Sequence, residues 1–226
     1  IFLGLDLQAD VVQAQKQYLA AQYLNGVHVY FVVYDLLPIA LPWAFPDGTD
    51  FVHSKWIQEI SKYDGVFCIS KAVADTYQEW AKDNIPNLSR DFLISWFHLG
   101  ADIANSAPST GLPDNAQDVL EHISSKASFV LIGTIEPRKG YAQTLQAFEE
   151  LWSKGVDVNL VFIGKQGWLV EDVIDKLKVH PELNKRLFWL ESISDEYLEK
   201  LYHASTCVIA ASFGEGFGLP LIEAAS

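Results

Sequence analysis

The chain has 226 residues, of which 50% are hydrophobic and 20% are charged. This length allows one large domain or two of about 100 residues each, and this apolar content excludes a wholly disordered chain. Acidic residues outnumber basic ones by 29 to 16, giving a formal charge of −13, which disfavours binding to nucleic acid or anionic lipid through broad basic surfaces. A phosphate-bearing ligand would therefore be held by a few placed cations and by backbone amides.

The first part of the chain alternates short apolar runs with amphipathic stretches, a pattern typical of parallel α/β architecture. The pattern predicts strands over residues 1–7, 27–34, 66–69 and 92–97, and helices over 11–24, 50–62 and 71–82. Ser70 stands at the N-cap position of the third helix. A Pro-rich apolar stretch over residues 36–48, LLPIALPWAFPDG, predicts a loop.

A shift in composition to Asn, Ser, Pro, Gly and Asp predicts the domain boundary. We place part of an N-terminal domain at residues 1–102, a linker at 103–126 and a C-terminal domain at 127–226. In the C-terminal domain, strands are predicted over 129–132, 159–163, 187–190 and 207–211, with helices from about 141, from about 170 and after the N-cap Ser194. The chain has no initiator Met and stops inside a predicted helix, so we expect it to be part of a longer polypeptide.

The two cysteines, Cys68 and Cys207, each lie in a short apolar run. This context predicts two buried thiols that pack as small apolar side chains. Neither the spacing nor the surroundings favour a disulfide or a metal site. With no signal peptide or long apolar span in the sequence, we expect a cytoplasmic protein.

The strongest local motif lies between Glu215 and Glu223, after the last predicted strand. Glycines at 214, 216 and 218 let the backbone approach a ligand, and the helix that follows presents free N–H groups suited to phosphate. Carboxylates accept hydrogen bonds only, which suits them to vicinal hydroxyls. The alternative is a Gly-rich turn in which Glu223 merely complements the helix dipole.

A second motif, GTIEPRKG at residues 133–140, follows the first strand of the C-terminal domain. It contains the adjacent cations Arg138 and Lys139. The planar guanidinium of arginine can form two parallel hydrogen bonds to phosphate, and the flexible lysine side chain carries a compact positive charge. The alternative is a solvated basic turn before a helix. Because both motifs follow strands of one predicted parallel sheet, we expect them at the same edge, which favours a shared binding site.

The second unit resembles the C-terminal domain of glycosyltransferase family 4, also called the group 1 glycosyltransferases. These are retaining nucleotide-sugar enzymes with the GT-B fold, in which two Rossmann-like doubly wound α/β domains face a cleft. Two glutamates separated by seven residues, Glu215 and Glu223, match the signature of this family. Its other motifs correspond in order to GTIEPRKGY at 133–141, FIGKQGW at 162–168 and LFWLESISDEYLEKLY at 187–202. In the first unit, CIS at 68–70 and HLGAD at 98–102 are similar to its strand-end serine and closing Gly-x-Asp.

The resemblance implies a catalytic set of Glu215, Arg138 and Lys139. The two cations would bind the donor diphosphate and stabilise the departing nucleotide, and Glu215 would contact the transferred sugar. Glu223 would hold the ribose hydroxyls. The rest of the implied donor site is lined by Gly133, Thr134, Gly164, Lys165, Ile193, Gly216, Phe217, Gly218 and Leu219.

The sequence departs from the family in three places. Thr134 replaces a frequent arginine, Tyr34 precedes Asp35 where a His-Asp pair is common, and the N-terminal glycine loop is absent from this chain. No Asp-x-Asp triplet occurs, so we expect neither a metal nor another cofactor.

The resemblance further implies a mannosyltransferase of surface-polysaccharide synthesis, with GDP-mannose as the first choice of donor and a UDP-sugar as the second. The acceptor would be a glycan or lipid-linked glycan, reached by peripheral association with the inner face of the cytoplasmic membrane. Two alternatives remain open. One is a GT-B epimerase or phosphorylase, and the other is a non-catalytic nucleotide-sugar-binding module.

Overall fold

The computed structural model describes residues 1–100 and 107–225. It contains two compact units. The first comprises Ile1–Gly100 together with Gly214–Phe217, and the second comprises the remaining described residues. The predicted closing residue Asp102 and the start of the predicted linker, 103–106, lie outside the described residues.

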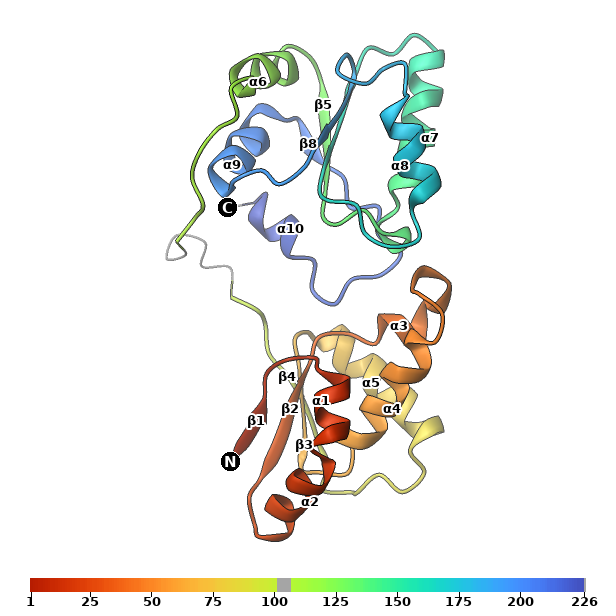
Figure 1. Ribbon diagram of the computed structural model, residues 1–226, viewed down its shortest axis with the longest axis vertical. Helices are drawn as coiled ribbons and strands as arrows, with labels where there is room; N and C mark the ends of the chain where they lie inside the picture. Colours follow the sequence, from red (N-terminus) through yellow and green to blue (C-terminus); the bar gives the residue numbers. More distant parts are fainter. Residues whose placement is uncertain (101–106, 226) are drawn as a thin grey trace. The chain divides into compact units, whose positions relative to one another are not determined.

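The first unit is built on a four-stranded parallel sheet with the order β1-β2-β3-β4 (Figure 1). Its strands are β1 (Phe2–Gly4), β2 (Val29–Val33), β3 (Gly65–Cys68) and β4 (Leu93–Trp96). Its helices are α1 (Ala9–Ala14), α2 (Lys16–Leu24), α3 (Leu37–Ala40), the 3-10 helix η1 (Pro42–Ala44), α4 (Thr49–Ile60) and α5 (Lys71–Asn84). Buried side chains from α1, α2, α4 and α5 form one apolar core with β2 and β3.

Two local predictions for this unit need correction. The helix expected over 11–24 is divided at Gln15, whose ψ of 5° departs from helical backbone. The loop expected over 36–48 contains α3 and η1, each with a proline in its first turn, where the missing N–H costs no hydrogen bond. The predicted N-cap is confirmed, since Ser70 Oγ accepts a hydrogen bond from the Val73 N–H at 3.2 Å.

The second unit is a parallel sheet with the order β7-β6-β5-β8. Its strands are β5 (Ser128–Ile132), β6 (Asn159–Ile163), β7 (Leu187–Leu190) and β8 (Cys207–Val208). Its helices are α6 (Ala116–Ser124), the 3-10 helix η3 (Pro137–Lys139), α7 (Tyr141–Ser153), α8 (Glu171–Lys178), α9 (Asp195–Ala204) and α10 (Leu219–Glu223). One core cluster joins the sheet to α7 and α8, and another joins it to α6 and α9. Helices therefore cover both faces of this sheet (Figure 1).

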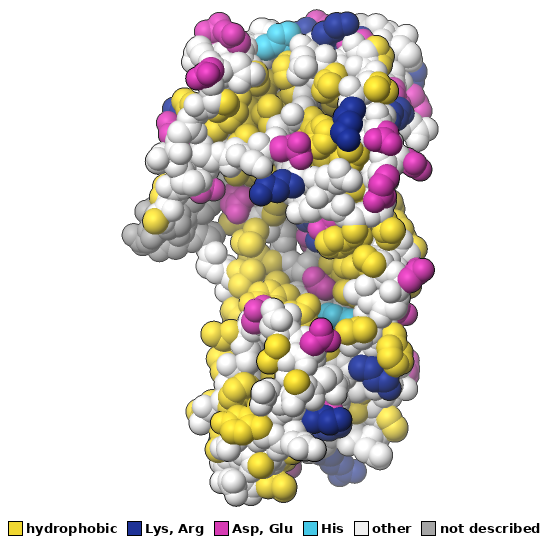
Figure 2. Space-filling view, viewed as in Figure 1, with side chains coloured by type: hydrophobic (Ala, Val, Ile, Leu, Met, Phe, Trp, Pro, Cys, Tyr) yellow, Lys and Arg dark blue, Asp and Glu magenta, His cyan; other side chains and the backbone are white. Residues whose placement is uncertain are grey.

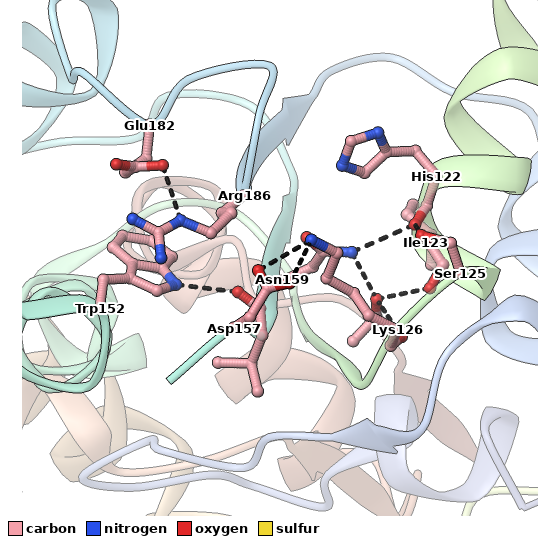
Figure 3. A network of polar contacts seen from close by, with 11 residues as sticks. His122, Ile123, Ser125, Lys126, Trp152, Asp157, Asn159, Glu182 and Arg186 are labelled. Atoms are coloured by element: carbon pink, nitrogen blue, oxygen red, sulfur yellow. Dashed lines mark hydrogen bonds and ion pairs between the residues drawn. The ribbon is translucent and has the colours of Figure 1, made fainter. Parts of the chain in front are cut away.

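Helix α6 lies inside the segment that composition predicts as a linker. Its apolar residues Ala116, Val119, Leu120 and Ile123 follow helical spacing and pack on the core of the second unit. A hydrogen-bonded network anchors the end of this helix to the sheet (Figure 3). Asn159, at the start of β6, donates to Ser128 Oγ at 2.9 Å, and Ser128 Oγ donates to the Ile123 carbonyl at 2.6 Å.

The segment before α6 is held against α9. Ser109 donates to the Asp195 carboxylate through its N–H at 2.8 Å and through its hydroxyl at 2.7 Å. Ser194, the predicted cap, accepts from the Tyr197 N–H at 3.1 Å and donates to the Gly111 carbonyl at 2.6 Å. The Ser194 cap is thus confirmed, and hydrogen bonds at Ser109 and Gly111 fix the segment before α6 to the second unit.

One cysteine prediction is wrong. Cys68 is buried in β3, but Cys207 is exposed. The expected strand over 207–211 is reduced to the two residues of β8, which pairs only with β5 and forms an edge of the described sheet. An apolar run at such an edge is not enclosed on both sides, so its side chains are less buried than those of a central strand.

Candidate functional site

The strand order of the second sheet reverses at β5. The chain runs outward from β5 through β6 to β7 and then returns to place β8 on the other side of β5. In open α/β sheets, ligands bind beyond the carboxyl ends of the strands at such a switch point. Residues 133–140 follow β5 directly, and the glycine-rich segment follows β8. The topology therefore places the candidate site at this edge of the sheet.

At this edge of the sheet, the backbone that follows β5 packs directly against the backbone that follows β6. Gly133 and Gly164, which follow β5 and β6, have positive φ angles of 130° and 155°. The Gly133 N–H donates to the Ile163 carbonyl at 2.9 Å, and the Gly164 N–H donates to the Leu190 carbonyl at 3.0 Å. A methyl group on Gly164 would overlap the Gly133 carbonyl oxygen. Only glycine allows this approach, so a ligand here would meet main-chain groups.

Lys139 lies over Gly133. A methyl group on Gly133 would be 3.5 Å from Lys139 Cε and 3.7 Å from Nζ, so the ammonium sits at the end of β5. Tyr141, the first residue of α7, donates a hydrogen bond from its hydroxyl to the Gly133 carbonyl. Burial raises the pKa of Tyr141, and the nearby Glu136 raises it further. The phenol therefore keeps its proton and remains a donor at neutral pH.

Arg138 is paired within its own turn. Its Nε lies 2.9 Å from Glu136 Oε2, and the two side chains are only 15% and 7% exposed. The carboxylate therefore offsets much of the guanidinium charge inside the protein. Glu136 belongs to the quoted motif, but the sequence offered no reason to assign it a role.

The β5 turn and the segment after β8 are joined by hydrogen bonds. The Phe213 N–H donates to the Arg138 carbonyl at 2.8 Å, and the Gln143 amide donates to the Ala211 carbonyl at 2.9 Å. At Gly140, with a φ of 74°, a side chain would collide with the Ala211 carbonyl. Hydrogen bonds within the second unit therefore connect the β5 turn with the residues that directly precede the glycine-rich segment.

Glu223 lies at the end of α10 and faces α9. Burial raises the pKa of Tyr202, and the adjacent Glu223 carboxylate raises it further. Gly218, whose φ is 87°, precedes α10, and Leu219 is its first residue. The second half of the glutamate signature thus belongs to the second unit, where it rests against α9.

The first half of the signature belongs to the first unit. Gly214–Phe217 packs there, with Phe217 against the apolar core and with the Gly216 carbonyl accepting a hydrogen bond from Ser70 Oγ at 2.7 Å. Glu215 is exposed between these anchored neighbours. The structure therefore assigns Glu215 and Glu223 to different compact units.

The remaining predicted residues also lie at strand ends. Thr134 and Lys165 are exposed, and the Lys165 carbonyl accepts from the Ile135 N–H at 2.8 Å. Trp189 Nε1 donates to the Gly164 carbonyl at 3.0 Å, which fixes the end of β6. Ile193 lies between β7 and α9 and packs on the core. The contacts thus gather Gly133, Gly164, Lys165, Arg138 and Lys139. Within the part of the chain that the structure describes, the contacts named here do not join Ile193 or Glu223 to this group.

Three general properties of the described residues bear on function. Lys and Arg side chains are dispersed among acidic ones on the face shown in Figure 2. Within residues 1–100 and 107–225, no cluster of three or more His, Cys, Asp or Glu side chains could hold a metal ion. No helix of that same part is long and apolar enough to cross a membrane.

Solved structures of similar fold align with nearly the whole chain. A UDP-forming α,α-trehalose-phosphate synthase from Burkholderia xenovorans aligns with a TM-score of 0.67 and 11% identity, covering 99% of this chain and 55% of that one. Anabaena Alr3699/HepE, solved with UDP-glucose, aligns with a TM-score of 0.67 and 15% identity, covering 98% and 56%. The fold is therefore the two-domain GT-B fold of glycosyltransferases.

The sequence comparisons narrow this class to a family. The family model described as glycosyl transferases group 1 matches residues 114–226. The chain belongs to this family. It is 45% identical over 228 residues to the serotype-specific mannosyltransferase WbdA of Escherichia coli, an alignment that covers 100% of this chain and 28% of that protein. The chain thus spans less than a third of the length of this relative.

Proposed function

We propose that this chain is the donor-binding part of a mannosyltransferase that takes GDP-mannose and transfers mannose, with retention of anomeric configuration, to a glycan acceptor. The observation that carries the proposal is the switch-point edge of the second unit, where Lys139 lies over a floor of glycine backbone. The 45% identity to a mannosyltransferase supports the choice of sugar. The description of that relative as serotype-specific supports a surface glycan, free or lipid-linked, as the acceptor.

In this proposal, Lys139 makes the largest contribution to diphosphate binding. Its ammonium lies at the end of β5, beside the glycine backbone of Gly133. Arg138, paired with Glu136, holds the turn and adds a weaker attraction. Negative charge grows on the diphosphate as the sugar leaves, and a preorganised cation stabilises that charge. The two cations take the place of a metal ion, so transfer is expected to survive chelation.

The two glutamates serve different parts of the donor. Glu223, held beside Tyr202, accepts hydrogen bonds from the ribose hydroxyls. Glu215, exposed between two glycines, contacts the transferred mannose. The amides of Phe217, Gly218 and Leu219 approach the sugar and phosphates. The backbone near Ile193 meets the base.

The phosphate assignment is tested by titrating the nucleoside diphosphate GDP in a calorimeter. A charge-assisted hydrogen bond contributes about 1.5–3 kcal/mol, so Lys139→Ala should weaken binding about tenfold or more. Arg138→Ala should weaken it less, because Glu136 already engages the guanidinium. Lys154→Ala is the matched control, since that lysine is 69% exposed and lies at the C-terminal end of α7, whereas the motif precedes the N-terminal end of that helix. Unchanged affinity in the double variant at 138 and 139 would remove the phosphate assignment.

The glutamate assignments are tested with conservative amides. Glu223→Gln should weaken binding of GDP as well as GDP-mannose, whereas Glu215→Gln should leave GDP binding nearly intact and depress transfer. The reason is that contacts made mainly in the transition state lower kcat when they are lost. Equal losses of GDP affinity in both variants would contradict this division. Tighter binding of UDP than GDP by the unaltered protein would move the donor to a UDP-sugar.

A further inference from the structure

Ser70 makes two hydrogen bonds of opposite sense. Its Oγ accepts from the Val73 N–H at 3.2 Å, which caps α5, and donates to the Gly216 carbonyl at 2.7 Å. A serine hydroxyl carries one proton, so the bond to Gly216 uses its whole donor capacity. The side chain therefore links the start of α5 to the glycine-rich segment.

The glycines on both sides of Glu215 pack closely against residues of the first unit. A side chain at Gly216 would collide with the Tyr34 carbonyl oxygen, and one at Gly214 would lie 2.6 Å from Leu37 Cδ2. Phe217 packs on the apolar core and makes an edge contact with His98 at a centroid distance of 5.9 Å. Glycine is otherwise the most flexible residue, so this segment needs such restraints to hold one conformation.

We propose that Ser70 is a positioning residue for Glu215, acting through the Gly216 carbonyl. The inference rests on the proposed role of Glu215 in contacting the transferred sugar. Close packing limits where the segment can lie, and the Ser70 hydrogen bond fixes the peptide plane between Gly216 and Phe217, one residue beyond Glu215. A displacement of about 1 Å at a reacting centre can lower the rate about a hundredfold.

The capping and positioning roles can be separated because they use different properties of the hydroxyl. Capping needs only an acceptor, and Asp, Asn and Thr all cap helices. Positioning needs a donor, which Thr and Asn have and an ionised Asp lacks. Ser70→Asp should therefore preserve α5 while breaking the link to Gly216. Ser70→Asn, nearly identical in size to Asp, should retain part of the link, and Ser70→Thr should retain most of it.

The experiment measures thermal stability and amide hydrogen exchange in these three variants, and mannose transfer in the whole protein that carries each substitution. Ser70→Asp should melt close to the unaltered protein, show faster exchange at Gly216 and Phe217, and lose kcat about tenfold with a smaller change in donor KM. Ser70→Thr should restore both exchange and kcat. Thr76→Ala is the control, since Thr76 on the same helix also donates to a backbone carbonyl, that of Ala72, at 2.9 Å.

Exchange that stays unchanged in Ser70→Asp would overturn the link itself. Faster exchange with unchanged kcat would overturn its role in positioning. If the whole protein that contains this chain transfers no mannose, the proposed function fails, but the exchange measurement still decides whether Ser70 holds the segment. Equal losses of stability in Ser70→Asp and Ser70→Thr would show that the side chain acts only through the fold, and this too would refute the proposal.

Discussion

Replacing Gly164 with alanine should destabilise the second unit strongly. The added methyl group would overlap the Gly133 carbonyl oxygen, and no rotamer change relieves a collision with backbone. The ends of β5 and β6 would have to separate, which would weaken the hydrogen bonds from the Gly133 and Gly164 N–H groups, each worth about 1 kcal/mol. Overpacking adds about 1–3 kcal/mol. The collision alone should therefore cost about 3–5 kcal/mol, and the strain of a positive φ adds to this loss.

Gly155→Ala provides the matched control. Gly155 lies in the same unit with a φ of 80°, and a methyl group there would meet nothing within 4 Å. Its replacement should cost only the left-handed backbone strain, about 1–2 kcal/mol. The difference between the two variants therefore isolates the collision with Gly133 from the effect of a positive φ.

The assay is urea unfolding followed by tryptophan fluorescence. Trp189 reports directly on the site, because its Nε1 donates to the Gly164 carbonyl at 3.0 Å. The free energy of unfolding should fall by about 3–5 kcal/mol more in Gly164→Ala than in Gly155→Ala. Similar losses in the two variants would show that the ends of β5 and β6 separate at little cost. The inference that Gly133 and Gly164 form a rigid backbone contact would then be refuted.

Three further predictions concern the rest of the molecule. Hydrogen bonds from the Ser109 N–H and hydroxyl lower the pKa of Asp195 in the folded protein. This carboxylate therefore contributes stability above its unfolded pKa, and the contribution is lost as pH falls through the folded pKa. The difference in Tm between the unaltered protein and Asp195→Asn should shrink from about pH 6 to about pH 3. Asn159→Ala should lower the free energy of unfolding by about 1–3 kcal/mol in calorimetry, because it removes the amide that donates to the fully buried Ser128 hydroxyl. No measurable loss would contradict the network in Figure 3. Burial raises the pKa of Cys68 to about 12, so in the folded protein a chromogenic disulfide reagent should modify the exposed Cys207 and reach Cys68 only after unfolding; fast reaction of both thiols would refute this.

The sequence predicts elements best where the signal is local. The predicted bounds of β6 and β7 match the structure, and both predicted serine caps, at Ser70 and Ser194, make their hydrogen bonds. Helix α6 was missed because composition was weighed above the helical spacing of its apolar residues. Cys207 was misjudged because its exposure depends on the place of β8 in the sheet, which an apolar run does not reveal.

The positions of the two motifs after strands of one sheet could be predicted from the sequence, but the contacts of their side chains could not. The order of the motifs along the chain places the β5 turn and the glycine-rich segment after strands of one sheet. The partner of Arg138 was not predictable, because it depends on how the turn folds around Glu136. The Ser70 contact with Gly216 joins residues 146 positions apart, and no local pattern encodes such a pair.

The pairing of Arg138 with Glu136 bears on how a product would leave. Together with Lys139, these side chains give the turn one net positive charge. A nucleoside diphosphate released by sugar transfer carries more negative charge than the donor, so a more strongly basic turn would retain it. Product release limits turnover in many enzymes. Under the proposed function, the Glu136 carboxylate limits the affinity of the turn for the released nucleoside diphosphate. Glu136→Gln should therefore tighten binding of this product and slow its release.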